Sequence, residues 1–318
     1  MVELKDILSA QQNIAGKVHR TPLMPATTLG NRVNMNLYLK AEVFQKTGSF
    51  KPRGAVNKLS QLTDEERKRG VIGLSSGNHA QGLAYAASLF GIAATLVMPR
   101  TTQPNKIEAT KGYGAEVVLT EGYPKAEETC MQLQKERNLV LVHPYNDPYI
   151  VAGQGTTGLE ILEDLPSVDV VFVPIGGGGL ISGIAAAIKS NQPSVKVIGV
   201  EAVGAPAMRL SLQQKKVVHL ETTNTVADGL SPPDVGEINL ALAQKYIDDV
   251  VLVSDDELTE AMWTVIERCK IVVEPSGAAG AAAVLFRKTS LPAGSQVVCV
   301  LSGGNINRSR LASLASKE

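Results

Sequence analysis

The feature that most constrains this chain is a repeated alternation of short apolar runs with helical stretches. The runs "GVIGLSS" (70–76), "IAATLVMP" (92–99) and "AEVVLT" (115–120) are separated by "NHAQGLAYAASLFG" and "PNKIEATKGYG", which have helical patterns. The apolar runs are continuous rather than alternating, which is typical of parallel strands buried on both faces. The sequence therefore predicts an α/β fold.

The same alternation returns in the second half of the chain. Apolar runs at 168–175, 195–200, 246–254 and 296–302 are joined by helical patterns near 180–190 and 255–269 and after "EPSG". No linker divides the chain cleanly, so we expect two interleaved domains, each with a parallel sheet. The stretch 221–240 is a long irregular connector, and such loops are often functional.

Composition limits the classes of partner. Lys and Arg total 31, as do Asp and Glu, and this balance argues against nucleic acid or an anionic membrane surface as a partner. No apolar run reaches the roughly 18 residues of a membrane span, and the charged, helical start is not a signal peptide. The three cysteines are far apart, with no CxxC, and are expected to be reduced and mostly buried. We therefore expect a cytoplasmic enzyme.

A run of four glycines, Gly176, Gly177, Gly178 and Gly179, follows one predicted strand and precedes a helix that starts near Leu180. Glycines leave backbone N–H groups free to surround an anion at a helix N-terminus, which predicts a phosphate site. The competing reading is a dinucleotide, because Glu201 ends the next strand where a ribose-binding carboxylate would lie. The GxGxxG spacing fails, however, and no lysine makes the loop a Walker A motif. A monophosphate fits better.

A second loop, "SSGNHAQG" (75–82), also leaves a strand and opens a helix. Ser76 or Asn78 could simply cap that helix. Together, Ser75, Ser76, Gly77, Asn78 and His79 also supply several donors at one positive helix end, which suits a carboxylate. His79 is interpreted as an orienting or packed residue rather than a base.

Two further features complete the pattern. Ser302 in "LSGGN" belongs either to an ordinary turn or to a site where its hydroxyl meets a ring nitrogen. Lys51, in "KTGSFKPRGA", is expected to lie in a turn, shielded by Phe50 and Pro52, in a setting that disfavours the ammonium form. Pyridoxal phosphate has a phosphate, an aldehyde that reacts with lysine and a pyridine nitrogen. The four features therefore predict this cofactor and an amino-acid substrate.

The chain resembles the fold-type II (tryptophan synthase β-like) pyridoxal phosphate enzymes, within the serine/threonine dehydratase and serine racemase group. "KTGSFKPRGA", "SSGNHAQG", "GGGGL", "EPSGAAG" and "LSGGN" occur in order, and the similarity covers about residues 5 to 310. The resemblance implies that Lys51 bonds covalently to the cofactor beside Phe50. It also implies contacts of Asn78 with the ring hydroxyl, of Gly176 to Leu180 with the phosphate, of Ser302 with the pyridine nitrogen, and of Gly229 with the pocket.

The resemblance also implies an arrangement of domains. A small mobile domain, residues 43–144, would close on a large cofactor-binding domain made of residues 1–42 and 145–318. We expect a homodimer or a homotetramer. Because the biosynthetic threonine dehydratases of this group carry a further regulatory region and this sequence ends at Glu318, we expect no inhibition by isoleucine.

The reaction expected from this resemblance is β-elimination of water from L-threonine or L-serine, giving a 2-oxo acid and ammonia. A hydroxyl at Ser302, in place of a carboxylate, leaves the pyridine largely neutral, and this favours expulsion of a β-substituent. Lys51 would take the Cα proton. The cofactor phosphate would protonate the leaving hydroxide.

Several alternatives remain open at this point. Ser76 stands where racemases keep a second acid/base, although related dehydratases often carry serine there too. Glu201 matches the first cation ligand of the racemases, but Ala207 stands at the later acidic position, so we expect no metal. Serine racemase, or a dehydratase of hydroxyaspartate or another β-hydroxy amino acid, is the alternative within the group. Outside it are a non-catalytic pyridoxal phosphate carrier and a nicotinamide-dependent dehydrogenase.

Overall fold

Two β-sheets organise residues 1–315, the part of the chain that this computed structural model describes. Within these residues the larger sheet has the order β1-β2-β10-β7-β8-β9 and the smaller β5-β4-β3-β6. The strands are β1 Leu23–Pro25, β2 Asn36–Ala41, β3 Val71–Leu74, β4 Ala94–Pro99, β5 Glu116–Thr120, β6 Val140–Leu141, β7 Val170–Pro174, β8 Lys196–Ala202, β9 Asp249–Val253 and β10 Gln296–Leu301.

All neighbouring strands are parallel except β1, which pairs antiparallel with β2 at the edge of the larger sheet. The predicted α/β class with two parallel sheets is confirmed, with this one antiparallel edge strand added. β4 and β7 are buried along their whole lengths, as their continuous apolar sequences predicted.

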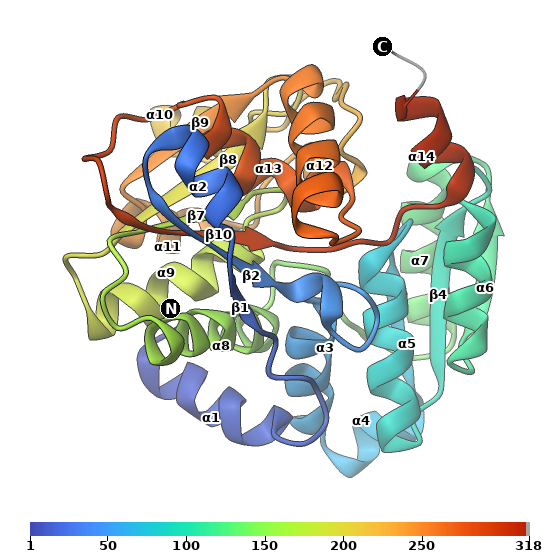
Figure 1. Cartoon of the computed structure of the whole chain (residues 1–318). Helices are drawn as coiled ribbons and strands as arrows, with labels where there is room; N and C mark the ends of the chain where they lie inside the picture. The colour runs from blue at the N-terminus through green and yellow to red at the C-terminus, as the bar shows by residue number, and fades with distance from the viewer. Residues whose placement is uncertain (316–318) are drawn as a thin grey trace.

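Helices cover the two sheets, and Figure 1 shows the smaller unit, with α5, α6 and α7 around β4, beside the larger one. The smaller sheet lies within residues 43–144 and the strands of the larger sheet lie outside that range. The helices are α1 Leu4–Ile14, α2 Thr27–Val33, α3 Lys51–Ser60, α4 Asp64–Arg69, α5 Asn78–Phe90, α6 Pro104–Gly112, α7 Gly122–Glu136, α8 Pro148–Asp164, α9 Gly179–Asn191, α10 Ala207–Gln214, α11 Glu237–Tyr246, α12 Asp255–Cys269, α13 Pro275–Leu285 and α14 Arg308–Ala315, with 3₁₀ turns η1 Glu42–Phe44 and η2 Asp228–Leu230.

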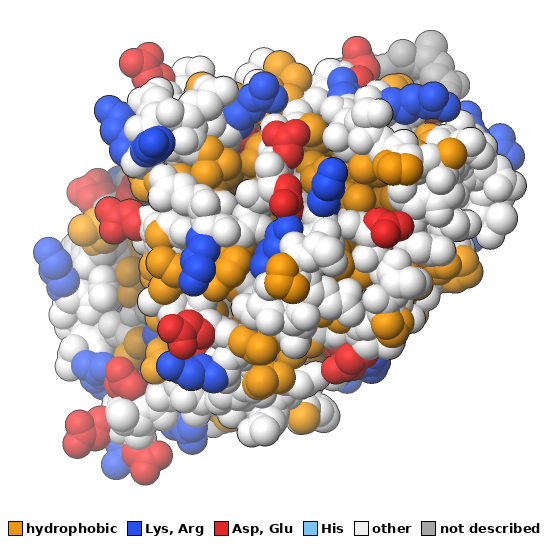
Figure 2. Space-filling view, turned by 90° about the vertical axis from the view of Figure 1, so that its left-hand side faces the viewer, with side chains coloured by type: hydrophobic (Ala, Val, Ile, Leu, Met, Phe, Trp, Pro, Cys, Tyr) orange, Lys and Arg blue, Asp and Glu red, His pale blue; other side chains and the backbone are white. Residues whose placement is uncertain are grey.

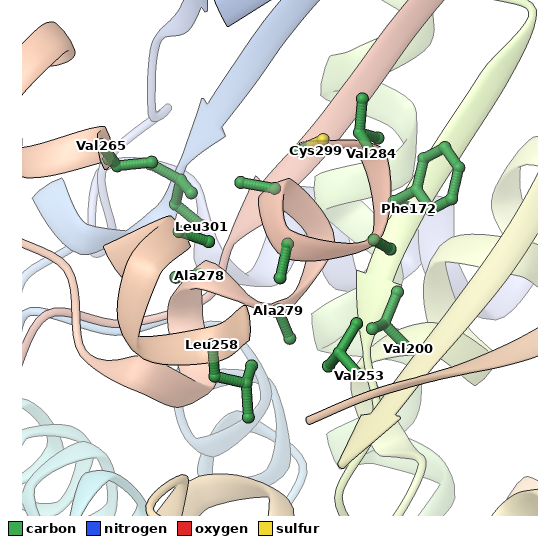
Figure 3. Packing of buried hydrophobic residues seen from close by; sticks show 14 of the residues in the cluster. Phe172, Val200, Val253, Leu258, Val265, Ala278, Ala279, Val284, Cys299 and Leu301 are labelled. Carbon is green, nitrogen blue, oxygen red and sulfur yellow. The ribbon is translucent and has the colours of Figure 1, made fainter. Parts of the chain in front are cut away.

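The core of the larger unit is built around α13, a helix rich in alanine and glycine. Phe172, Val200 and Val253 project from three strands toward Ala278 and Ala279 of α13 (Figure 3). Small residues let this helix lie very close to the sheet: a Cβ built on Gly280 would be 3.1 Å from the carbonyl oxygen of Phe172. This close packing positions the N-terminus of α13 and the end of β10 beside each other.

Buried charges join the two units. Arg53 of α3 is fully buried and pairs with Glu42 at 2.8 Å and with Glu160 at 2.7 Å. Lys40 of β2 is also fully buried, 2.7 Å from Glu160. Buried charges are tolerated only when they are paired and hydrogen-bonded in this way.

The surface and the cysteines agree with the composition. On the face drawn in Figure 2, Lys and Arg side chains are interspersed with Asp and Glu, with no block of one sign. Cys130 and Cys299 are buried and Cys269 is partly buried, all three as free thiols. In residues 1–315, no helix combines the length and the apolar character that crossing a membrane requires.

Candidate active site

Three of the predicted motifs follow the carboxyl ends of neighbouring strands, in the order β2, β10 and β7. The segment after β2 is tied to the segment after β10, because Ser49 bridges Gly303 and the Phe50 N–H donates to the Ser302 carbonyl at 3.1 Å. Ligands of α/β folds bind outside the carboxyl ends of strands. The structure therefore brings "KTGSFKPRGA", the tetraglycine loop and "LSGGN" together at the end of the larger sheet where its parallel strands terminate.

Lys51 is the first residue of α3, with Phe50 as the N-cap, so the expectation that it lies within a turn is wrong. The turn is the preceding Thr-Gly-Ser segment, in which Gly48 has a positive φ of 71°. Lys51 Nζ donates to the carbonyl oxygen of Pro144 at 2.8 Å and lies 5.0 Å from the centroid of the Phe50 ring.

Burial lowers the pKa of Lys51 from 10.5 to about 8. Both the Pro144 carbonyl and the Phe50 ring favour the ammonium form, so removal from water outweighs them. The position at a helix N-terminus, where the backbone dipole is positive, also disfavours a cation. Lys51 is thus an amine poised to lose its proton near neutral pH.

The tetraglycine loop presents free donors. Gly178, with φ +91°, is the N-cap of α9, which begins at Gly179. Within the described residues 1–315, none of the N–H groups from Gly176 to Leu180 donates a hydrogen bond. Free N–H groups at the positive end of a helix form an anion site. The predicted phosphate cradle therefore has the required geometry.

The ring of Tyr145 covers one side of the cradle, a feature that the sequence reasoning missed. A Cβ built on Gly177 would lie 2.3 Å from carbon atoms of this ring, so only glycine fits there. Asn239 Nδ2 holds the two segments together by donating to the carbonyl oxygens of Gly177 at 2.7 Å and Tyr145 at 3.1 Å. The Tyr145 hydroxyl donates to Asp234 at 3.0 Å. No local sequence signal marks Tyr145, since it reaches the loop only through tertiary structure.

Ser302 directly follows β10 and Gly229 lies in η2, and their contacts with a cofactor remain predictions. Ser302 is buried, and its hydroxyl donates to no group among residues 1–315, which leaves it available to a ligand atom. The Gly229 N–H donates to Ser276 Oγ at 2.8 Å. The Gly229 carbonyl lies against the tetraglycine loop, 2.4 Å from where a Cβ on Gly176 would be.

The loop after β3 is not closed by a side-chain cap. α5 begins at Asn78 with Gly77 as N-cap, so the reading of Ser76 or Asn78 as a helix cap is wrong. Ser75 Oγ accepts the Gly77 N–H at 3.1 Å, and Ser76 is exposed. The loop lies at the positive end of α5, which suits an anion, and binding of a substrate carboxylate there remains a prediction.

His79 is buried, as its interpretation as a packed or orienting residue required. Its Nε2 lies 3.0 Å from the carbonyl oxygen of Val142, so the ring donates there, and Nδ1 is buried without a partner in the described residues. Burial, with a further contribution from Lys51, lowers the pKa of His79 to about 3. The ring is therefore neutral at physiological pH, and its contact with a substrate carboxylate remains a prediction.

The Asn78 side chain connects this loop to the larger sheet. Its Nδ2 donates to Glu274 Oε1 at 2.7 Å, and its Oδ1 accepts from Asn305 Nδ2 at 2.8 Å. Asn305 also donates to the carbonyl oxygen of Thr47 at 2.7 Å. Glu274 and Asn305 belong to the motifs "EPSGAAG" and "LSGGN", so both residues carry a local sequence signal. The network holds the Asn78 side chain between Glu274 and Asn305, and its contact with the ring hydroxyl of the cofactor remains a prediction.

Glu201 is engaged in local structure. Its two carboxylate oxygens accept the N–H groups of Met208 at 2.6 Å and Arg209 at 2.9 Å, at the start of α10. Burial raises its pKa to about 7. The helix begins at Ala207, the position that lacks an acidic side chain, and no cluster of three or more His, Cys, Asp or Glu suited to a metal occurs in residues 1–315.

Comparison with known proteins shows which family and which relatives this chain is similar to. The family model described as "Pyridoxal-phosphate dependent enzyme" matches residues 14–303. L-threonine ammonia-lyase of Thermotoga maritima is 47% identical over 319 residues, which cover 100% of this chain and 79% of that protein. L-threo-3-hydroxyaspartate ammonia-lyase of Saccharomyces cerevisiae is 41% identical over 98% of this chain and 95% of that protein.

Among solved structures, maize serine racemase superposes with a TM-score of 0.94 at 40% identity, covering 99% of this chain and 97% of that one. The likeness extends over the whole fold and is not confined to one motif. Together with the match of the family model over most of the chain, it confirms the predicted family. The chain belongs to the pyridoxal-phosphate-dependent enzymes of fold type II.

Proposed function

We propose that this protein catalyses the pyridoxal-phosphate-dependent β-elimination of water from L-threonine and L-serine, which gives a 2-oxo acid and ammonia. The identity of 47% to an L-threonine ammonia-lyase over the full chain supports this reaction. The structural observation that supports the proposal is Lys51, because burial lowers the pKa of its amine to about 8. An amine with that pKa can exchange a proton with substrate at neutral pH.

The residues present fit the cofactor. The free N–H groups from Gly176 to Leu180 match a phosphate, the unpartnered Ser302 hydroxyl matches a ring nitrogen, and Lys51 matches an aldehyde. A Cβ on Gly177 would collide with the Tyr145 ring, so this position in the loop accepts only glycine. When bound, pyridoxal phosphate supplies an aldehyde that captures amines and a ring that accepts electron density from Cα.

The chain's own side chains then have distinct tasks. The Ser75–His79 loop binds and orients the substrate carboxylate through hydroxyls and N–H groups at the start of α5. Lys51 accepts the Cα proton at Nζ. Ser302 offers a hydroxyl in place of a carboxylate, so it does not keep the ring nitrogen protonated, and elimination is favoured over a long-lived carbanion. Asn78, fixed by Glu274 and Asn305, orients the ring.

Two alternatives have specific support. Serine racemase is favoured by the likeness to the maize enzyme and by the exposed Ser76, which could protonate Cα from the face opposite Lys51. A hydroxyaspartate lyase is favoured by the 41% identity to the yeast enzyme. Incubating the pure protein with L-threonine, L-serine and L-threo-3-hydroxyaspartate, while measuring 2-oxo acid and D-isomer, separates the three. The 2-oxo acid from L-threonine should dominate.

The division into a large domain (1–42 and 145–318) and a small mobile domain (43–144) is part of the same proposal. The two sheets support it, since one lies within 43–144 and the other outside. Closure of the smaller unit would bring the Ser75–His79 loop onto bound substrate and exclude water. Small-angle X-ray scattering with and without substrate should report a smaller radius of gyration for the complex.

We also propose a homodimer or homotetramer in the cytoplasm. Phe44 and Val272 are 47% and 54% exposed, and these are large exposed fractions for apolar residues. Gly304 brings their segments together, because a Cβ built on it would lie 2.6 Å from the Val272 carbonyl oxygen and 3.4 Å from Val43. A shared apolar area suits a contact between subunits. Light scattering after size exclusion should give a molar mass that is a multiple of the chain mass. The variant Phe44→Ser should give a lower molar mass.

A further inference from the structure

Lys106 is a charged side chain in an unusual place. It lies on α6 of the smaller unit, and its side chain is only 7% exposed. The nearest carboxylate oxygen belongs to Asp228 of η2, 3.9 Å from Lys106 Nζ, which is beyond hydrogen-bond distance. Among residues 1–315, Nζ donates no hydrogen bond. Most of the side chain is thus removed from water while its charge has no hydrogen-bonded partner, which leaves the ammonium available to an anion.

The side chain of Lys106 lies directly beside the carboxylate-binding loop. A Cβ built on Gly77 would be 3.3 Å from Lys106 Nζ and 3.4 Å from its Cδ. The loop itself contains serines, glycine and asparagine, and His79 is held neutral, its pKa lowered to about 3 by burial. The Ser75–His79 loop thus offers neutral donors to an anion, and the positive charge next to it comes from Lys106.

Two acidic side chains face this ammonium, and neither neutralises it closely. The Asp228 side chain is 59% exposed, so water screens its charge. Glu274 directs Oε1 to Asn78 at 2.7 Å, and burial raises its pKa toward the neutral form, against the opposing influence of Lys106. Lys106, Asp228 and Glu274 line one small cavity. An anion entering beside the Ser75–His79 loop would meet a cation with free donors.

We propose that Lys106 is a positioning residue that supplies the positive charge for the substrate carboxylate at the Ser75–His79 loop. Lys106 acts through the loop beside it, and the inference rests on the proposed function, in which the ligand is an α-amino acid. The same ammonium reaches toward Asp228, whose neighbour Gly229 contacts the tetraglycine loop. Binding of the carboxylate is therefore linked to the approach of α6 to η2, and so of the two units.

The test compares a carboxylate with its neutral counterpart. Dissociation constants for L-threonine and L-threonine amide are measured from the change in cofactor absorbance of the holoenzyme, for wild type and for Lys106→Met. A lost charge-assisted contact corresponds to roughly tenfold or more. We expect Lys106→Met to raise the dissociation constant of L-threonine by at least that factor, mostly as a higher KM. The dissociation constant of the amide should change less than about twofold.

Matched variants separate charge from structure. Lys106→Arg keeps the charge and should restore most of the preference for L-threonine. Lys111→Met, on the same helix with an exposed side chain paired to Glu108 at 3.6 Å, should behave as wild type. Asp228→Asn leaves Lys106 in place and should keep the preference for L-threonine. It should weaken the binding of L-threonine and of the amide to the same small extent.

Equal weakening of acid and amide in Lys106→Met, or no weakening of either, would overturn the inference, because Lys106 would then only hold the fold or be irrelevant to the carboxylate. Formation of 2-oxobutanoate by wild type is recorded in the same series. If it is absent while cofactor absorbance still responds to L-threonine, the proposed reaction fails and the binding ratio still decides the role of Lys106.

Discussion

Lys51 Nζ donates a hydrogen bond to the carbonyl oxygen of Pro144 at 2.8 Å, which ties the start of α3 to the segment that leads into α8. The amine is thereby held at the residue that precedes Tyr145, whose ring packs against Gly177 of the tetraglycine loop. Replacing it should remove the bond to the cofactor without removing the pocket. Lys51→Ala is expected to lose the visible absorbance of the protein as isolated and its turnover, while its circular dichroism stays that of wild type. A cofactor bond that borohydride still reduces in this variant would assign the anchor to another lysine.

The pKa of about 8 for Lys51 predicts how the apoprotein should respond to pH. The neutral amine is the reactive form, and its fraction rises as pH increases through 8 and levels off above it. The rate at which apoprotein gains cofactor absorbance should therefore rise with a midpoint near pH 8. N-acetyl-lysine methylamide, measured with the same cofactor over the same pH series, corrects for titration of the cofactor. A protein midpoint no lower than that of this free amine would contradict the assigned shift.

Gly177 should be intolerant of any side chain. The Cβ of Gly177→Val would collide with the Tyr145 ring and displace the N–H groups from the phosphate. We expect the dissociation constant of pyridoxal phosphate to rise at least about tenfold, the equivalent of one lost charge-assisted hydrogen bond. Gly112→Ala, which has open space around it on α6, is the control. Cofactor affinity that does not change would return the loop to a purely structural role.

The buried ion pairs should dominate the stability of the junction between the units. Arg53→Met leaves Glu42 and Glu160 without their shared partner, and breaking such a buried pair costs about 3–5 kcal/mol. Arg137→Met removes an exposed pair with Glu116 and should cost less than about 1 kcal/mol. Urea unfolding midpoints of the two variants test the difference. Equal losses would mean that burial adds nothing to the Arg53 pairs.

Much of the fold was predictable because parallel strands buried on both faces leave continuous apolar runs. β3, β4, β5, β7, β9 and β10 all fall within predicted runs, and β8 extends two residues beyond its predicted run, to Ala202. The antiparallel β1 is too short, at three residues, to leave such a pattern. The buried pair of Arg53 and Glu160 is separated by more than a hundred positions, and only the folded chain brings these residues together.

The residues of the site were likewise predictable only where their signal lies in adjacent positions of the sequence. Glycine loops and the Lys51 segment carry local signals, because their chemistry depends on residues that are adjacent in sequence. Tyr145 and Lys106 carry none: each comes from a different element and approaches a loop through packing. Lys106 lies in a helix with a weakly amphipathic sequence, so nothing in the pattern distinguishes it from a solvated surface lysine.

Ser76 should separate racemisation from elimination. Racemisation needs a proton donor on the face of Cα opposite Lys51, and the exposed Ser76 hydroxyl is the candidate. Elimination needs only the Lys51 side and a protonated leaving group. Ser76→Ala is expected to reduce any interconversion of L- and D-serine far more than 2-oxo acid formation from L-threonine, as measured by chiral chromatography and a coupled 2-oxo acid assay. Equal losses in the two rates would remove the distinction.

The most direct test of the central claim measures both products of one reaction. Wild-type protein is incubated with L-serine, with and without a chelator of divalent cations, and pyruvate and D-serine are quantified from the same samples. Both carboxylate oxygens of Glu201 already accept N–H groups at the start of α10, so a cation is not expected to be required. We predict that pyruvate forms faster than D-serine and that the chelator changes either rate only modestly. D-serine forming faster than pyruvate, or loss of most activity to the chelator, would contradict the lyase assignment in favour of a racemase.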